Sequence, residues 1–180
     1  DKIYALNRFD MKWVDGGRYA ILGPSGWGKT TMLNIMSGIV RPSEGRLLFD
    51  DIDVTDHITA DRNIAQVFQF PVIYGTMTVQ DNLAFPLVCR GYDKAFIKAK
   101  VAEVSEALNL EGLLTQSANK LTADQKQLIS LGRGLVRDNV AAVLMDEPLT
   151  VIDPDLKFRL RRKLKEINQK YRSTLIYVTH

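Results

Sequence analysis

The stretch Gly23-Pro24-Ser25-Gly26-Trp27-Gly28-Lys29-Thr30 matches the pattern Gly-x-x-x-x-Gly-Lys-Ser/Thr. It follows an apolar segment expected to form a strand (18–22) and opens a segment with helical spacing (29–37). Its glycines allow successive backbone N–H groups to face phosphate oxygens, and the helix N-terminus adds a positive dipole. Lys29 is expected to place a charge beside the β- and γ-phosphates, and the Thr30 hydroxyl is suited to Mg²⁺. The stretch predicts a nucleotide phosphate site made of Gly23, Pro24, Ser25, Gly26, Trp27, Gly28, Lys29, Thr30 and Thr31. A glycine-rich turn without a ligand is the weaker alternative.

Strands and helices alternate along the rest of the chain. Further strands are expected at 46–49, 64–68, 140–145 and 174–178, and helices between 76 and 137 and over 155–171. This order indicates an α/β fold with a parallel sheet and a helical insertion. The expected domains are a first part of the sheet core (1–75), a helical subdomain (76–137) and a second part of the core (138–180).

Composition excludes several classes of protein. The chain has 180 residues, of which 46% are hydrophobic and 25% charged, as in an ordinary globular protein large enough for one core. A single cysteine, Cys89, excludes an internal disulfide. The longest aliphatic run (140–145) is far shorter than the ~20 residues of a membrane-spanning helix. The net charge of +3 does not by itself imply a nucleic-acid partner.

Both ends of the sequence suggest a fragment. The chain begins at Asp1 with no visible targeting segment, and it stops at His180 directly after a β-branched strand pattern. Because a domain rarely ends on its own buried strand, we expect a longer polypeptide that is truncated here at the C-terminus.

A second motif is an apolar strand that ends in two acids, at Asp146 and Glu147. Proteins with a phosphate loop place a carboxylate beside Mg²⁺ in this way, so Asp146 is the candidate metal ligand. Glu147 is then available to orient or deprotonate the attacking water. On its own such a pair would more often be a helix cap or a solvated turn, and the phosphate loop is what favours the catalytic interpretation.

The order of these motifs resembles the nucleotide-binding domain of ATP-binding cassette (ABC) proteins over essentially the whole chain. The resemblance implies a RecA-like P-loop NTPase core, ATP and Mg²⁺ as ligands, and ATP hydrolysis. It also implies a glutamine loop, in which Gln69 senses Mg²⁺ and water and relays their state to the helical insertion. By the same resemblance Asp153 lies in the loop that meets a partner subunit, and His180 is the switch histidine at the γ-phosphate.

The signature segment departs from the family. Its usual sequence is Leu-Ser-Gly-Gly-Gln, whereas this chain has Leu121-Thr122-Ala123-Asp124-Gln125. In the family, the N-terminus of the helix that begins at this segment crosses a dimer interface and contacts the ATP on the opposite subunit. In this chain the carboxylate of Asp124 would repel the phosphate there. Thr122 and Gln125 also form a capping-box pattern, and both roles can hold together. We therefore expect an asymmetric dimer, with a sound catalytic site of its own and a weakened signature offered to the partner.

The segments 63–69, 76–79 and 81–87 resemble the ATPase subunits of bacterial carbohydrate and polyol importers. The Ala-Asp pair of the signature (123–124) and the run Phe-Gln-Phe-Pro (68–71) resemble those of glycerol-type importers in particular. That resemblance implies an energy-coupling subunit at the cytoplasmic face of the inner membrane. Its partners would be transmembrane permease subunits, a second and non-identical ATPase and, indirectly, a solute-binding protein. No nucleic-acid partner is expected, because the basic stripe in 157–165 is interrupted by leucines at core-facing spacing. Two alternatives stay open: a soluble ABC ATPase without a transport role, and a regulatory subunit that holds ATP with little turnover.

Overall fold

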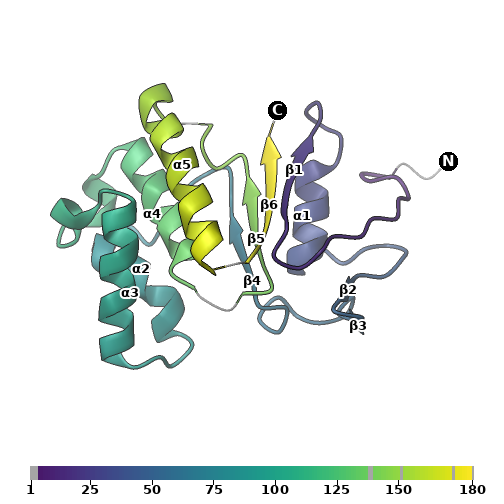
Figure 1. Cartoon of the computed structure of the whole chain (residues 1–180), viewed down its shortest axis with the longest axis horizontal. Helices are drawn as coiled ribbons and strands as arrows, with labels where there is room; N and C mark the ends of the chain where they lie inside the picture. The colour runs from purple at the N-terminus through teal and green to yellow at the C-terminus, as the bar shows by residue number, and fades with distance from the viewer. Residues whose placement is uncertain (1–3, 138–139, 151, 172, 180) are drawn as a thin grey trace. The chain divides into compact units, whose positions relative to one another are not determined.

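The computed structural model describes residues 4–137, 140–150, 152–171 and 173–179, which fold into two compact units (Figure 1). Unit 1 comprises Asp1–Gln66, Val140–Glu147 and Arg172–His180, and unit 2 comprises Val67–Asn139 and Pro148–Tyr171. Each unit therefore draws on segments that are far apart in the sequence. The three-part domain division expected from the sequence stays a prediction.

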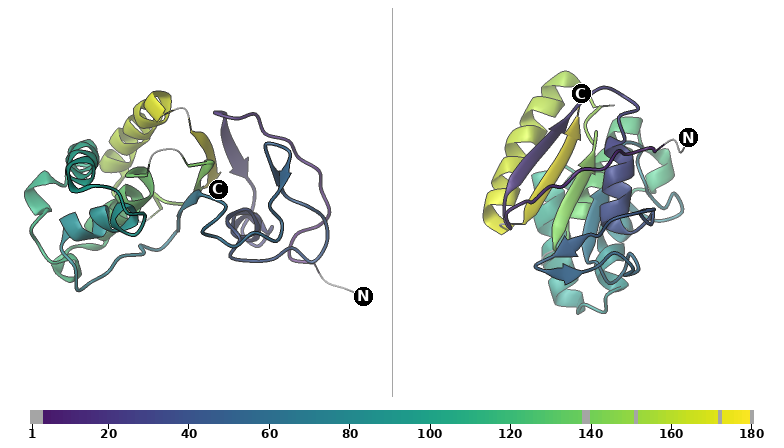
Figure 2. Two further views of the ribbon diagram at one scale, coloured as in Figure 1. Left: turned by 90° about the horizontal axis from the view of Figure 1, so that it is seen from below. Right: turned by 90° about the vertical axis from the view of Figure 1, so that its right-hand side faces the viewer.

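A four-stranded sheet has the order β1 (Arg18–Leu22), β6 (Thr174–Thr179), β5 (Ala142–Asp146), β4 (Ile64–Val67). β6 pairs in parallel with both β1 and β5, and the three strands run side by side in all views (Figures 1 and 2). Every residue of β5 is buried, as expected for a parallel strand covered on both faces. The expected α/β fold with a parallel sheet is confirmed.

The core of unit 1 forms where α1 (Lys29–Ser37) packs on the sheet. Met32, Leu33 and Met36 lie on the buried face of α1 and belong to one cluster with Leu144 of β5 and Ile176 of β6. The spacing of the three α1 residues is that of one helix face. The helix ends at Gly38, whose φ of 82° is in the left-handed region that favours glycine. The expected helix over 29–37 is confirmed at both ends.

Four expected strands have different ends, and one of them, β6, runs to Thr179 instead of 178. The strand expected over 46–49 begins only at Leu48, because the Leu47 N–H donates to the Thr55 hydroxyl oxygen (2.8 Å). β2 (Leu48–Phe49) then pairs antiparallel with β3 (Ile52–Asp53), a strand too short for its sequence to indicate. The strand expected over 64–68 ends at Val67, and the one expected over 140–145 runs from Ala142 to Asp146.

Unit 2 is mainly helical, as the sequence indicates. Its elements are α2 (Val79–Val88), α3 (Lys94–Ala107), the short 3₁₀ turns η1 (Glu111–Leu113) and η2 (Ala118–Lys120), α4 (Ala123–Leu135) and α5 (Pro154–Tyr171). α2 and α4 pack closely, since a Cβ on Gly132 would lie 2.5 Å from the Leu83 side chain. None of the helices in the described ranges is long and apolar enough to cross a bilayer.

Candidate functional site

The phosphate loop joins the end of β1 to the start of α1 in unit 1. Gly26 and Gly28 have φ of 82° and 78°, in the left-handed region where an L side chain is strained. Space is restricted at only one of the two. A Cβ on Gly28 would lie 2.4 Å from the Ala5 carbonyl oxygen, whereas one on Gly26 would meet nothing within 4 Å. The loop conformation therefore depends on both glycines, and Gly28 also allows the N-terminal segment to lie against it.

Lys29 is almost fully buried, with 9% of its surface exposed. Its Nζ donates to the carbonyl oxygens of Gly23 (2.6 Å) and Pro24 (2.8 Å), so the ammonium group is held across its own loop. Trp27 and Thr30 are exposed. The loop thus combines a positive charge, a helix N-terminus and an accessible hydroxyl, which is the chemistry that an oligophosphate requires.

The acidic pair lies at the sheet edge that carries the phosphate loop. Leu22 at the end of β1 is in register with Thr179, and Asp146 at the end of β5 with Val178. Because the strands are parallel, these carboxyl ends share one edge of the sheet, where α/β proteins bind ligands. Both acids are buried, with 4% of Asp146 and 9% of Glu147 exposed.

Glu147 has an unusual backbone. Its φ is 46°, a left-handed conformation that is rare for a residue with a side chain, and its N–H donates to the Val178 carbonyl oxygen (3.1 Å). The chain therefore turns sharply one residue beyond Asp146. Backbone strain of this kind is concentrated at functional sites.

The oxygen donors at this edge suit Mg²⁺ bound together with a nucleotide. Thr30 offers a hydroxyl and Asp146 a carboxylate, and Mg²⁺ is commonly held by one or two such ligands plus substrate phosphates and water. Within the described residues no group of three or more His, Cys, Asp or Glu could hold a metal ion by itself. The residues fit a nucleotide-dependent Mg²⁺ site rather than a metal centre made by protein alone.

The signature segment of unit 2 forms the start of α4. The Thr122 hydroxyl oxygen accepts from the Gln125 N–H (3.3 Å), and the Thr122 N–H donates to Gln125 Oε1 (3.0 Å). The predicted capping box is therefore confirmed. Asp124 lies in the first turn, where a negative charge favours the helix, and Ala123 beside it is exposed. Contact between this segment and a partner's nucleotide stays a prediction.

Three further residues, Gln69, Asp153 and His180, are expected at the site from the sequence. Gln69 lies two residues after the end of β4 and is half-buried. Asp153 caps α5: its Oδ1 accepts from the Asp155 N–H (3.0 Å), and its carbonyl oxygen accepts from the Lys157 N–H (2.8 Å). His180 lies outside the described residues. The functions expected of these three residues stay predictions.

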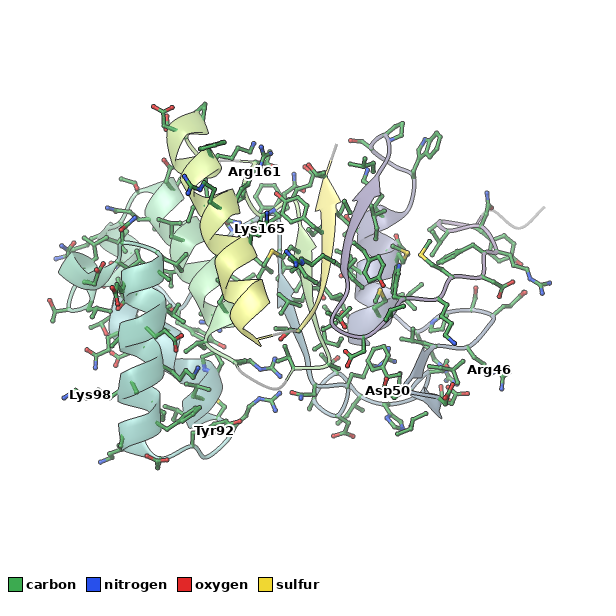
Figure 3. All side chains as sticks on the ribbon, viewed as in Figure 1. Arg46, Asp50, Tyr92, Lys98, Arg161 and Lys165 are labelled. Atoms are coloured by element: carbon green, nitrogen blue, oxygen red, sulfur yellow. The ribbon has the colours of Figure 1, made fainter. Side chains whose placement is uncertain are left out.

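The helix α5, which carries the basic residues of 157–165, has one apolar face. Leu160 and Leu164 are 2% and 6% exposed, whereas Arg161 and Lys165, labelled in Figure 3, are exposed. This is the arrangement of an amphipathic surface helix, as the sequence interpretation has it.

One residue that the sequence interpretation missed is Gln127, on α4. It has no exposed surface, and its Nε2 donates to the carbonyl oxygens of Pro148 (2.8 Å) and Phe68 (3.2 Å). The available signal was an amide among the apolar residues that form the buried side of the helix.

Comparisons with known proteins agree with this geometry. A family model described as "ABC transporter" matches residues 6–150. The sn-glycerol-3-phosphate import ATP-binding protein UgpC of Yersinia enterocolitica is 37% identical over 175 residues, which are 97% of this chain and 48% of that protein. The trehalose/maltose import ATP-binding protein MalK of Thermococcus litoralis is 40% identical over 185 residues, covering 99% and 50%. The chain thus spans about half the length of the curated relatives it matches.

Solved structures show the same fold. A dimeric bacterial ABC transporter cassette, MJ0796, has a TM-score of 0.89 at 28% identity, covering 99% of this chain and 81% of that one. A post-hydrolysis dimer of MJ0796 bound to ADP and Pi has a TM-score of 0.88 at 28% identity, with the same coverage. The expected P-loop NTPase core and the resemblance to ABC proteins are confirmed, and this chain belongs to the ABC transporter family.

Proposed function

We propose that this chain is the nucleotide-binding part of an ATP-hydrolysing subunit that drives an importer for a sugar or polyol. The observation that carries the proposal is the sheet edge of unit 1, where the phosphate loop and the buried acids Asp146 and Glu147 follow parallel strands in register. The importer class is supported by the names of relatives, which are import ATP-binding proteins for glycerol-3-phosphate and for trehalose and maltose.

In this proposal ATP binds through its phosphates to residues 23–31. Lys29 exchanges its bonds to the loop carbonyls for the β- and γ-phosphate oxygens, and the amides at the start of α1 donate to the same oxygens. Thr30, Asp146 and Gln69 would hold Mg²⁺, which neutralises phosphate charge when it is bound.

Glu147 is the proposed general base. It accepts a proton as a water oxygen bonds to the γ-phosphorus, while the bond from that phosphorus to the β–γ bridging oxygen breaks and ADP leaves with the electron pair. The burial of Glu147 and its turned backbone support this proposal, because both restrict the conformations of the residue. His180, just beyond β6, is proposed to contact the γ-phosphate.

The working unit is proposed to be a dimer of ATPase subunits at the cytoplasmic face of the membrane. Thr122, Ala123, Asp124 and Gln125 would face ATP on a second, non-identical subunit, and Asp153 would lie in the loop between the subunits. Permease subunits would complete the importer, and a solute-binding protein would deliver the substrate. The dimeric state of the structural neighbour MJ0796 supports this arrangement.

The test is ATP hydrolysis by the full-length protein with its permease in liposomes, with and without substrate-loaded solute-binding protein. We expect hydrolysis to rise when the loaded protein is added, and the substrate that raises it, glycerol-3-phosphate or a disaccharide, identifies the branch. A rate of ATP hydrolysis that is the same with and without the permease and the loaded solute-binding protein would contradict the importer proposal. It would favour a soluble ABC ATPase.

A second candidate is a subunit that holds ATP with little turnover. The position of Asp124 in the first turn of α4 favours it, because a carboxylate there opposes an approaching phosphate. Counting phosphate released per bound ATP in the full assembly separates the two candidates. Repeated turnover at the site built on Lys29 supports the catalytic subunit, and retention of intact ATP supports the regulatory one.

A further inference from the structure

The fixed orientation of the Gln127 amide is the starting point. Both of its partners, the carbonyls of Phe68 and Pro148, can only accept hydrogen bonds, so the NH₂ end must face them. The reverse orientation would set the amide oxygen against two carbonyl oxygens. One NH₂ group therefore joins three segments of the chain: α4, the strand-to-loop junction after β4, and the loop after β5.

The two carbonyls flank residues that the proposed reaction uses. Phe68 immediately precedes Gln69, the proposed sensor of Mg²⁺ and water. Pro148 immediately follows Glu147, the proposed general base. The Phe68 carbonyl and the Gln69 nitrogen belong to one planar peptide group, so a shift of the carbonyl moves Gln69 directly. The Pro148 carbonyl lies one residue beyond the Glu147–Pro148 peptide bond, and the fixed φ of proline couples its position to that of the Glu147 carbonyl.

Gln127 belongs to a continuous face of α4 that lies along residues 67–72, the segment that contains Gln69. One turn further on, the Ser130 Oγ accepts from the Val72 N–H (3.2 Å). Another turn on, a Cβ on Gly134 would lie 2.8 Å from Val67 Cγ2, so the helix approaches the end of β4 closely. Residues 127, 130 and 134 have the i, i+3, i+7 spacing of one helix face. These contacts join one face of α4 to residues 67–72.

The carbonyl end of the Gln127 side chain indicates that the residue does more than fill space in the core. Oε1 is buried and has no hydrogen-bond partner among the described residues. An unpaired buried acceptor lowers stability, and an apolar side chain of the same length would avoid that loss. The two bonds of the NH₂ group are therefore what Gln127 supplies and an apolar side chain would not.

We propose that Gln127 is a positioning residue for ATP hydrolysis, which sets the backbone beside Gln69 and Glu147 according to the position of the signature helix. The inference rests on the proposed function. α4 begins at the segment 122–125 that is proposed to meet the partner's ATP, and Gln127 follows in its second turn. Engagement of the helix end would in this way reach the subunit's own catalytic segments.

The test compares Gln127→Met with Ser130→Ala in the full-length protein assembled with its permease. Methionine matches glutamine in length but cannot donate, whereas Ser130→Ala removes one contact of the same helix face and leaves both carbonyl bonds in place. For each variant the kcat and KM for ATP hydrolysis, the nucleotide affinity and the Tm are measured. Gln127→Asn, which keeps the amide on a shorter stem, replaces Gln127→Met if the latter does not assemble.

We expect Gln127→Met to lower kcat by roughly 10- to 100-fold, as for a small misplacement of catalytic groups, with KM and ATP affinity almost unchanged. Ser130→Ala should keep kcat within about twofold, because it removes the hydrogen bond to Val72 but leaves both carbonyl bonds of Gln127 in place. A kcat for Gln127→Met equal to that of Ser130→Ala, or a loss of ATP affinity that accounts for the lower rate, would overturn the assignment. A wild-type assembly without ATP hydrolysis would overturn the proposed function and this assignment together.

Discussion

At the residue scale, the site depends on backbone conformations that few residues adopt. Gly28 and Glu147 both have positive φ, one at the start of α1 and the other one residue beyond β5. At Gly28 the lack of a side chain also leaves room for the Ala5 carbonyl oxygen, which a Cβ would approach to 2.4 Å. At Glu147 it turns the chain directly after the buried Asp146, so that two adjacent acids need not point the same way.

Gly28→Ala should abolish nucleotide binding, and Gly26→Ala is its matched control. Both positions have nearly the same φ, but only at Gly28 would the new Cβ collide with backbone, 2.4 Å from the Ala5 oxygen. Left-handed backbone alone costs an alanine about 1–2 kcal/mol. Calorimetric titration with ATP and thermal unfolding of the full-length protein measure both effects. Equal losses in the two variants would show that the contact with Ala5 is irrelevant.

The local part of the site is predictable from sequence, and the long-range part is not. Lys29 and Asp146 were identified because each lies within a short motif next to a strand. Gln127 was missed because its partner Phe68 is 59 positions away, so no local pattern records the bond. Its capping neighbours Thr122 and Gln125 were found, because a capping box spans only three positions.

At the element scale, the end of α1 is held by a buried charge. The Nη1 of Arg62 donates to the carbonyl oxygens of Ile35 (2.6 Å) and Met36 (3.2 Å), in the last turn of the helix. Its other nitrogens donate to the carbonyls of Thr55 and His57. Burial lowers the pKa of Arg62, yet the guanidinium stays charged at neutral pH and favours the negative helix end. The helix that begins at the phosphate loop is thus fixed at its other end as well.

Arg62→Lys should lower the free energy of unfolding by roughly 2–4 kcal/mol. The planar guanidinium bonds four carbonyl oxygens, whereas the compact lysine ammonium cannot reach all of them. Arg46→Lys, at an exposed position of the same unit (Figure 3), is the control and should change stability by less than about 0.5 kcal/mol. Urea unfolding of both variants measures the difference. A loss at Arg62 no larger than at Arg46 would contradict this assignment.

The elements themselves follow from sequence except where pairing decides their ends. The helix over 29–37 is predictable up to Gly38, since its limits are set by local residues. β3 was missed because two residues carry no periodicity, and β2 was placed too early because a Thr55 hydroxyl takes the Leu47 N–H. Tertiary contacts of this kind lie outside any local pattern.

At the scale of the whole molecule, the altered signature predicts unequal ATP sites. If the subunits pair head to tail, ATP at Lys29 faces the partner's signature, and the partner's ATP faces Asp124. Changing Ala123 and Asp124 together to glycine should raise hydrolysis at the partner's site, because it removes a like charge, and should leave the site built on Lys29 unchanged. Single-turnover hydrolysis in the reconstituted importer counts the competent sites. Two fully active sites in the wild-type assembly would contradict the asymmetry.

The central claim is that the sheet edge of unit 1 binds and hydrolyses ATP, with Glu147 as the base. The direct measurement compares ATP binding and single-turnover hydrolysis in the full-length assembly for wild type, Glu147→Gln and Lys29→Ala. We predict that Glu147→Gln binds ATP as tightly as wild type but loses hydrolysis by about 100-fold or more, because an amide cannot take the proton of water. Lys29→Ala should instead weaken binding itself. Hydrolysis by Glu147→Gln at close to the wild-type rate would contradict the account.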